Sequence, residues 1–347
     1  MAYRMSDVAK RAGVSKATVS RVLNNGKFID SKTRQRVLEV ARKLKYYQNV
    51  HASRLAHGRS DLFGLIISEI ANPFFPEVMR GFEKAALAKG FEVLLCNTEY
   101  GPERIDAAVR KMIANNVRGT AVMTSVMEAA HFKELVSHRI ATVLLDQRRS
   151  DRYLSSIRID YAGAVTQAID HLWKLGHRRF AFIAGPGNIR SAEKFRQAVL
   201  EAFEKRRIRF SRVLEGNHKV DGGAAAALTL LEIPELPTAI LCGNDLTAIG
   251  VLGALEGAGV SVPTDVSVVG FDDIYFARLA RPALTTIRLS REELGRLAFE
   301  ALEKALHSRR KLGALYTCET ELVVRQSTGP VKPGDRTLND ARETKHR

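Results

Sequence analysis

The sequence predicts an all-α helix-turn-helix headpiece followed by an α/β core of two doubly wound parallel-sheet lobes. The 347 residues carry a net charge of +16, and residues 1–60 alone contain 14 Lys and Arg against 3 Asp and Glu. Short helical patterns fill those 60 residues, whereas apolar β-branched runs alternate with amphipathic helices beyond them, as in βαβ units. There are too many βα units for one small sheet, which indicates two lobes and leaves a single closed barrel as the alternative.

The headpiece begins with two short helices joined by a tight turn. We expect Ser6 to cap the first helix, Gly13 to end it in the left-handed conformation, and Ser15 to cap the second. Apolar residues at helical spacing can pack the two helices together: Val8, Ala9, Ala12, Val14, Val19, Val22 and Leu23. Two helices linked by about three residues form a helix-turn-helix.

The outer face of the second helix carries the residues expected to read DNA. Two pairs of residues four positions apart share one side of that helix: Lys16 with Ser20, and Ala17 with Arg21. Arg21 or Lys16 can read a guanine in the major groove, and Ala17 can touch a thymine methyl. Phosphate contacts are assigned to three hydroxyls: Thr18, Ser31 and Thr33. The alternative is an ordinary helical hairpin with a basic exterior.

A third helix is expected from about Ser31, capped by that hydroxyl. Its apolar face holds Val37, Val40, Ala41 and Leu44. This helix would support the hairpin.

The core pattern predicts seven strands and six helices. The strands are 62–67, 91–96, 119–123, 141–145, 179–183, 238–241 and 266–269. The helices are 76–89, 102–115, 162–175, 192–207, 245–258 and 291–307. Polar and charged residues near 148–156 indicate the division between lobes. We therefore predict a headpiece (1–47), a hinge and linker (48–60), a two-lobed core (61–327) and a disordered tail (328–347).

Composition and motifs argue against several other classes of protein. No run of about 18 apolar residues and no signal peptide is present, so we expect a cytoplasmic protein without membrane contact. The three cysteines, Cys96, Cys242 and Cys318, are widely separated and fit buried thiols. No nucleophile elbow, phosphate loop or metal-binding histidine pattern occurs, so we expect neither catalytic residues nor a metal or cofactor.

The headpiece resembles that of the lactose-repressor (LacI/GalR) family. The resemblance rests on SDVAKRAGVS at 6–15 and TVSRVLN at 18–24, and continues through KTR at 32–34, LKYY at 44–47 and NVHASRLA at 49–56. In that family the last stretch is a hinge helix that inserts a leucine, here Leu55, into the minor groove. The resemblance also implies DNA contacts at Ser6, Ser15, Asn24, Tyr46, Asn49 and Ala52. From its residues alone, 49–57 is a polar linker.

The resemblance extends over residues 5–327 and implies a core like that of periplasmic binding proteins. It rests on LIISEIANPFF at 65–75, TAILCGND at 238–245, PTDVSVVGFDD at 263–273 and RPALTTI at 281–287. Strand ends of doubly wound sheets hold ligands. The expected effector-binding residues are Asn72, Phe74, Phe75, Asp146, Asn244, Asp245 and Asp272. Phe74 and Phe75 could instead be core residues, and Asp245 a helix cap.

One departure from the family concerns a cleft arginine that commonly follows the strand ending at IAGP, 183–186. An ungapped comparison puts Phe195 there, and Arg190 or Arg196 are the candidates to replace it. The ligand could accordingly be less polar, phosphorylated or absent.

The predicted function is a sequence-specific transcriptional regulator, in particular a repressor. It would act as a homodimer on a near-palindromic double-stranded operator, with a dimer surface near 76–89 and 248–256. A small effector bound between the lobes, with a sugar expected, would control operator affinity. The alternatives are an architectural DNA binder without effector and a sugar-binding protein without a regulatory role.

Overall fold

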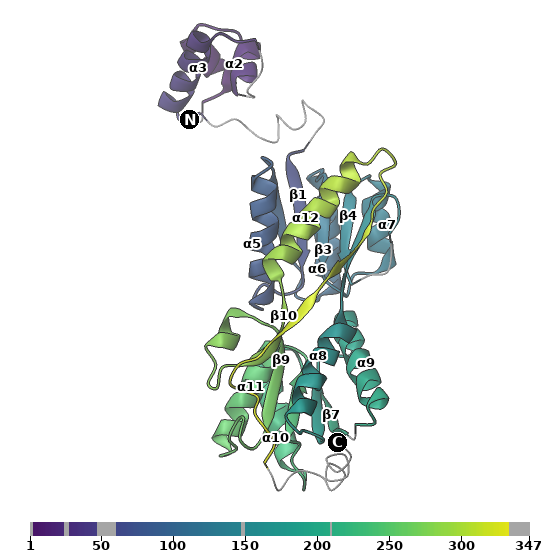
Figure 1. Ribbon diagram of the computed structural model, residues 1–347. Coiled ribbons are helices and arrows are strands. Elements are labelled where there is room, and N and C mark those ends of the chain that lie inside the picture. Colours follow the sequence, from purple (N-terminus) through teal and green to yellow (C-terminus); the bar gives the residue numbers. More distant parts are fainter. Residues whose placement is uncertain (1–2, 24–27, 47–59, 147–149, 209, 333–347) are drawn as a thin grey trace. The chain divides into compact units, whose positions relative to one another are not determined.

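The computed structural model describes residues 3–23, 28–46, 60–146, 150–208 and 210–332 (Figure 1). The chain divides into two compact units, Met1–Ser60 and Asp61–Arg347. Each unit has its own hydrophobic core, as the change in sequence pattern near residue 60 predicts.

The headpiece consists of three helices, α1 (Met5–Ala12), α2 (Lys16–Leu23) and α3 (Ser31–Lys43). Gly13 ends α1 with φ of 65°, a conformation that glycine adopts without steric cost. The predicted apolar residues form one core, in which Val8, Val19 and Val37 are fully buried. The helical spacing of these residues therefore decides the packing of the three helices.

Two of the three predicted helix caps are wrong. Ser6 lies inside α1, which begins after Arg4, and the Arg4 amide donates to the Asp7 carboxylate at 2.7 Å. The cap of α3 is Asp30, whose Oδ1 accepts from the Thr33 amide at 2.8 Å, because a carboxylate one position before Ser31 is the stronger acceptor. Ser15 caps α2 as predicted, accepting from the Thr18 amide at 3.1 Å.

The N-terminal lobe is built on a parallel sheet with strand order β11-β5-β4-β3-β1-β2. Its strands are β1 (Leu62–Ile67), β2 (Glu92–Asn97), β3 (Gly119–Met123), β4 (Ala141–Leu145), β5 (Leu154–Ile159) and β11 (Leu315–Cys318). Helices α5 (Phe74–Leu87) and α12 (Arg291–His307) cover one face. Helices α6 (Pro102–Ala114) and α7 (Ala129–Ser137) cover the other.

The C-terminal lobe repeats this plan with strand order β12-β10-β9-β8-β6-β7. Its strands are β6 (Phe180–Ala184), β7 (Phe210–Glu215), β8 (Ala239–Cys242), β9 (Ser267–Asp272), β10 (Thr285–Leu289) and the antiparallel β12 (Thr320–Val323). Helices α8 (Tyr161–Lys174) and α9 (Arg190–Lys205) cover one face. Helices α10 (Val220–Leu231) and α11 (Asp245–Gly257) cover the other, and a 3₁₀ turn, η1 (Tyr275–Arg278), follows β9.

The chain passes between the lobes three times, from β5 to α8, from β10 to α12 and from β11 to β12. Two open parallel sheets are thus confirmed, and the single barrel is excluded. The predicted division at 148–156 is wrong in detail, because β5 belongs to the N-terminal lobe and the first passage comes at Asp160. Both sheets direct the carboxyl ends of their parallel strands toward the passages (Figure 1).

Each lobe contains one pair of helices that pack unusually closely through glycine. A Cβ on Gly295 of α12 would lie 2.0 Å from the Val78 carbonyl oxygen of α5, and one on Gly81 of α5 would lie 2.0 Å from that of Glu292. In the other lobe, Gly223 of α10 and Gly250 of α11 make the equivalent close approach. Any larger side chain at these four positions would push the helices apart.

The ordered chain extends beyond the predicted start of the tail at 328. The Gly329 amide donates to Ser267 Oγ at 3.1 Å, and the Val331 amide donates to the Leu175 carbonyl at 3.0 Å. The Val331 side chain is buried. The prediction of disorder is therefore wrong for 328–332, where apolar burial and backbone hydrogen bonds fix a segment that looks polar in sequence.

Candidate functional site

The exposed face of α2 carries the cluster expected to read DNA. Lys16, Ala17 and Arg21 are exposed, whereas Thr18 and Ser20 are half-buried. The Ser15 hydroxyl is already engaged, since it caps α2 and lies 2.9 Å from Thr18 Oγ1. The side chains that remain directed at solvent are thus the cations and the small Ala17, a surface that fits a major groove.

The remaining predicted DNA contacts lie around this helix or outside the described residues. Ser31 is exposed at the start of α3, and Thr33, two residues later, is half-buried. Ser6 is half-buried on α1, and Tyr46 packs against the headpiece core. Four predicted contacts lie outside the described residues: Asn24, Asn49, Ala52 and Leu55.

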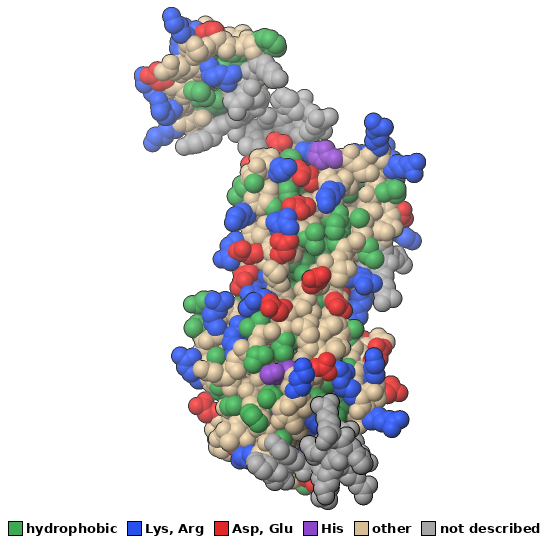
Figure 2. All heavy atoms as spheres, in the orientation of Figure 1, with side chains coloured by type: hydrophobic (Ala, Val, Ile, Leu, Met, Phe, Trp, Pro, Cys, Tyr) green, Lys and Arg blue, Asp and Glu red, His purple; other side chains and the backbone are tan. Residues whose placement is uncertain are grey.

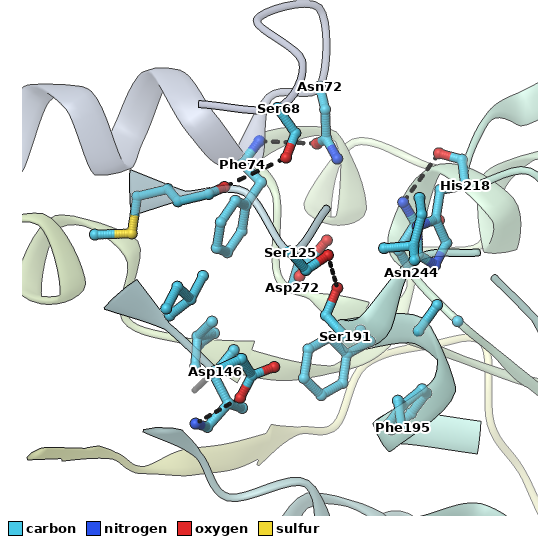
Figure 3. A pocket seen from close by; sticks show the side chains of 18 of the residues that line it. Ser68, Asn72, Phe74, Ser125, Asp146, Ser191, Phe195, His218, Asn244 and Asp272 are labelled. Carbon is cyan, nitrogen blue, oxygen red and sulfur yellow. Dashed lines mark hydrogen bonds between the residues drawn. The ribbon is translucent and has the colours of Figure 1, made fainter. Parts of the chain in front are cut away.

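A cavity lies between the two lobes of the core, beside the three passages of the chain. Figure 3 shows Phe74 and Asp146 on one side of this space and His218, Asn244 and Phe195 on the other. The cavity has a volume of about 100 Å³. At roughly 10–15 Å³ for each water, this volume has room for about seven to ten waters.

Asp146 follows β4 and connects the two lobes. Its carboxylate accepts from the Tyr161 hydroxyl at 2.6 Å, at the start of α8. Lys194 of α9 lies 3.7 Å from Asp146 Oδ1 and also donates to the Asp146 carbonyl. Burial raises the pKa of Asp146, and the Tyr161 hydroxyl and the Lys194 ammonium partly offset this rise. The ion pair joins the N-terminal lobe to the C-terminal lobe at the edge of the cavity.

Asp272 ends β9 and faces the cavity, with φ of 111°. Its backbone carbonyl accepts from the Arg291 guanidinium, which also pairs with Glu77 of α5 at 2.9 Å. Burial, together with the neighbouring Asp245, raises the pKa of Asp272 well above its usual range. A carboxyl group at this position can form hydrogen bonds with the hydroxyls of a ligand.

Aromatic rings form the floor of the cavity in the C-terminal lobe. Phe195 of α9 lies 4.8 Å from the Phe271 ring centroid and 5.9 Å from that of Tyr161. In the other lobe Phe74 and Phe75 are buried but line the cavity, with their rings 5.1 Å apart. Apolar surfaces therefore face the cavity from both lobes and suit the C–H faces of a small ligand.

The two amide side chains beside the cavity form hydrogen bonds with backbone groups of neighbouring residues. Asn72 Oδ1 accepts from the Phe74 amide at 3.0 Å. Asn244 caps α11 by accepting from the Thr247 amide at 2.9 Å and donates to the His218 carbonyl at 3.0 Å. Burial lowers the pKa of His218 to about 4, so its ring is neutral at pH 7. Asn244 keeps one N–H and one oxygen lone pair for a ligand.

Three comparisons place this geometry among known proteins. A family model described as bacterial regulatory proteins, lacI family, matches residues 4–49. A model described as periplasmic binding protein-like domain matches residues 169–328. The HTH-type transcriptional regulator DegA of Bacillus subtilis is 33% identical over 332 residues, covering 94% of this chain and 98% of DegA.

The chain belongs to the lacI family of bacterial regulatory proteins. It is a DNA-binding, repressor-like transcriptional regulator with a helix-turn-helix headpiece. The repressor PurR of Proteus mirabilis is 31% identical, with coverage of 93% of this chain and 96% of PurR. No helix in the described part of the chain is long and apolar enough to cross a membrane.

Solved structures of other lacI-family proteins agree with this assignment. A lac repressor dimer bound to operator and the anti-inducer ONPF superposes with a TM-score of 0.85 at 27% identity, covering 95% of this chain and all of that one. A complex of the transcriptional regulator CelR with cellobiose superposes with a TM-score of 0.70 at 26% identity, covering 94% of this chain and 99% of CelR.

Within this lacI-family core, six of the nine predicted effector contacts lie together. They line the cavity between the lobes: Asn72, Phe74, Phe75, Asp146, Asn244 and Asp272. Asp245 does not line it, because its carboxylate accepts from the Ile274 amide and the Thr286 hydroxyl. Arg190 and Arg196 do not line it either. These three side chains therefore lie outside the cavity lining in this structure.

Several lining residues were missed in the sequence although a usable signal existed. Ser68 follows β1, Ser125 follows β3 and His218 follows β7, so all three obey the rule that ligands meet the carboxyl ends of strands. Ser125 and Ser191 approach each other across the cavity at 3.4 Å. Gly185 leaves room for the His218 ring, which occupies the space that a Cβ at this position would fill. No such signal pointed to Tyr161, since β5 before it was not predicted.

Proposed function

We propose that this lacI-family regulator binds a near-palindromic operator as a homodimer, and that a small neutral polyhydroxylated ligand in the cavity controls operator affinity. The observation that carries the proposal is the cavity's position between two lobes joined by three chain passages. A ligand that contacts both lobes changes their relative orientation only if it binds one arrangement more tightly than the other. Such a protein would act in the cytoplasm, where the chromosome lies.

The ligand class follows from the chemistry of the cavity wall. Two carboxyl groups, of Asp146 and Asp272, face the space with hydroxyls from both lobes. None of the described lining residues is Lys or Arg, so the wall supplies no charge to balance a phosphate or carboxylate. Carboxyl and hydroxyl groups between aromatic faces are the partners that a sugar or similar polyol needs.

DNA recognition is assigned to the exposed face of α2. Arg21 and Lys16 can make bidentate contacts to guanine, and Ala17 leaves space for a thymine methyl. Homodimer formation would pair two such helices, so that two half-sites are read in one binding event. Within the described residues, we assign phosphate contacts to Ser31 and Thr33 at the start of α3.

The deciding experiment selects bound sequences from random duplexes with the full-length protein. The affinity of the selected duplex is then measured with neutral sugars, sugar phosphates and buffer alone. A two-fold-symmetric consensus and an affinity that changes only with a neutral sugar would support the whole proposal. A consensus whose affinity did not respond to any ligand would indicate an architectural DNA binder without an effector. The absence of a consensus would contradict sequence-specific regulation.

A further inference from the structure

The end of the N-terminal lobe where its strands begin is formed by six loops. Because the sheet is parallel, the segments that precede its strands lie at one end, opposite the cavity. Residues 308–313 join this end, since the Tyr153 amide donates to the Lys311 carbonyl at 2.7 Å and the Gly313 amide donates to the Asp151 carbonyl at 3.0 Å. We call this surface the strand-start rim: residues 61, 88–92, 115–118, 138–140, 150–153 and 308–313.

The strand-start rim is strongly basic although the core as a whole is nearly neutral. It contains seven Lys and Arg against three Asp and Glu, a net charge of +4. Residues 61–330 contain 35 Lys and Arg against 32 Asp and Glu, a net charge of +3. The rest of the core therefore carries about one net negative charge, and the rim accounts for the whole net positive charge of the core.

Three arginines on the rim are available to a partner. Arg139, Arg309 and Arg310 are exposed, and none lies within ion-pair distance of a carboxylate among the described residues. Figure 2 shows Lys and Arg side chains together at the end of the lobe where α12 ends. The other rim cations are partly occupied, as with Lys89, 3.6 Å from Glu303, and Arg152, which lies over the Tyr153 ring.

The covalent chain ties this rim to the DNA-binding headpiece. Asp61 begins the core at the rim, and Tyr46 is the last described residue of the headpiece. The chain advances by 15 residues from Tyr46 to Asp61, so it cannot span more than about 54 Å even when fully extended. Double-stranded DNA carries one negative charge about every 1.7 Å along its axis, so duplex that continues past an operator offers many phosphates within this reach.

We infer that the strand-start rim is a second DNA-binding surface, which holds the phosphate backbone of the duplex flanking the operator through Arg139, Arg309 and Arg310. This inference rests on the proposed operator binding by the headpiece. The contact carries no sequence information, because it is made to phosphates and not to base edges. It increases the affinity for long DNA and makes that affinity more sensitive to salt.

The test compares a triple variant, Arg139→Gln with Arg309→Gln and Arg310→Gln, with the full-length wild type. Each is titrated on the selected operator as a duplex without flanks and as one extended by two helical turns on both sides. The wild type should bind the extended duplex at least tenfold more tightly at low salt. In the triple variant this advantage should disappear, and the slope of log K against log salt should fall by at least about 1 on the extended duplex.

The matched control removes charge elsewhere on the core. Lys205 and Arg207 are exposed near the end of α9, in the loop that precedes β7 and hence at the far end of the C-terminal lobe. Lys205→Gln with Arg207→Gln should retain the length dependence. If both variants lost the length dependence equally, the effect would be one of general charge and the inference would be overturned. A wild type whose affinity did not depend on duplex length would also overturn it. If the wild-type protein did not bind the duplex without flanks, the proposed operator binding itself would be wrong.

Discussion

Replacing Lys194 by Met should open the cleft between the lobes. Lys194 Nζ lies 3.7 Å from Asp146 Oδ1, and the two charges attract by about 4 kcal/mol at an effective dielectric constant of about 20. The Lys194 side chain is 33% exposed, so much of this attraction is regained as hydration when the pair separates. A net effect of about 1 to 2 kcal/mol remains, which shifts the ratio of closed to open lobes roughly tenfold.

Energy transfer between two dyes across the cleft measures this shift. Cysteines introduced at Glu103 and Lys219 would carry the dyes, because both positions are exposed and lie in different lobes. The native thiols would label poorly, since burial raises the pKa of Cys96, Cys242 and Cys318. Transfer should fall in Lys194→Met and stay unchanged in Lys205→Met, which removes a charge from the same helix. Equal transfer in both variants would refute the role of the ion pair.

Three further predictions concern stability and recognition. Gly295→Ala should lower the free energy of unfolding by about 3 kcal/mol because the new methyl meets the Val78 carbonyl, whereas Gly253→Ala, with open space on α11, should raise it by about 0.5 to 1 kcal/mol in the same urea titration. Burial raises the pKa of Asp245 to about 7, so the native state binds more protons than the unfolded state between about pH 4 and 7. The stability of the wild type should therefore fall relative to that of Asp245→Asn as the pH rises from 5 to 8. Thermal unfolding measured across this pH range would contradict the prediction if the two stability curves ran parallel. Arg21→Ala should cost about 1 to 3 kcal/mol on the selected operator and much less on random duplex, and equal losses would reduce Arg21 to a phosphate contact.

The sequence predicted the structure best where local pattern alone decides it. The strands Leu62–Ile67, Gly119–Met123 and Ala141–Leu145 have the predicted bounds because each is a short, almost wholly buried run rich in apolar and β-branched residues. The strands Leu315–Cys318 and Thr320–Val323 were missed because they are short, partly exposed sheet edges with no such run. Their pairing is decided by residues about 160 and 35 positions earlier in the chain, which no local window contains.

Side-chain direction was the second thing that local pattern could not decide. Asp245 and Asp272 both follow the motifs expected at the cleft, but only Asp272 faces it. Asp245 turns the other way because Gly270 leaves space beside its carboxylate, with Oδ1 2.2 Å from the position of a Cβ there. The backbone amide of Ile274 then fixes the other oxygen at 2.8 Å. The orientation is a property of three strands brought together, so it could be read only from the folded chain.

The positions of Lys194 and Phe195 on α9 influence which ligands the cavity can bind. Phe195 stands where the resemblance to the family places a cleft arginine, and Lys194, one position earlier on α9, pairs with the cavity residue Asp146. One residue along a helix is a rotation of about 100°, which moves the charge from the floor of the cavity to its edge. There it pairs with Asp146, while Phe195 packs on Phe271. In this chain α9 therefore presents an aromatic surface to the cavity through Phe195, and its neighbouring cation Lys194 joins the two lobes through Asp146.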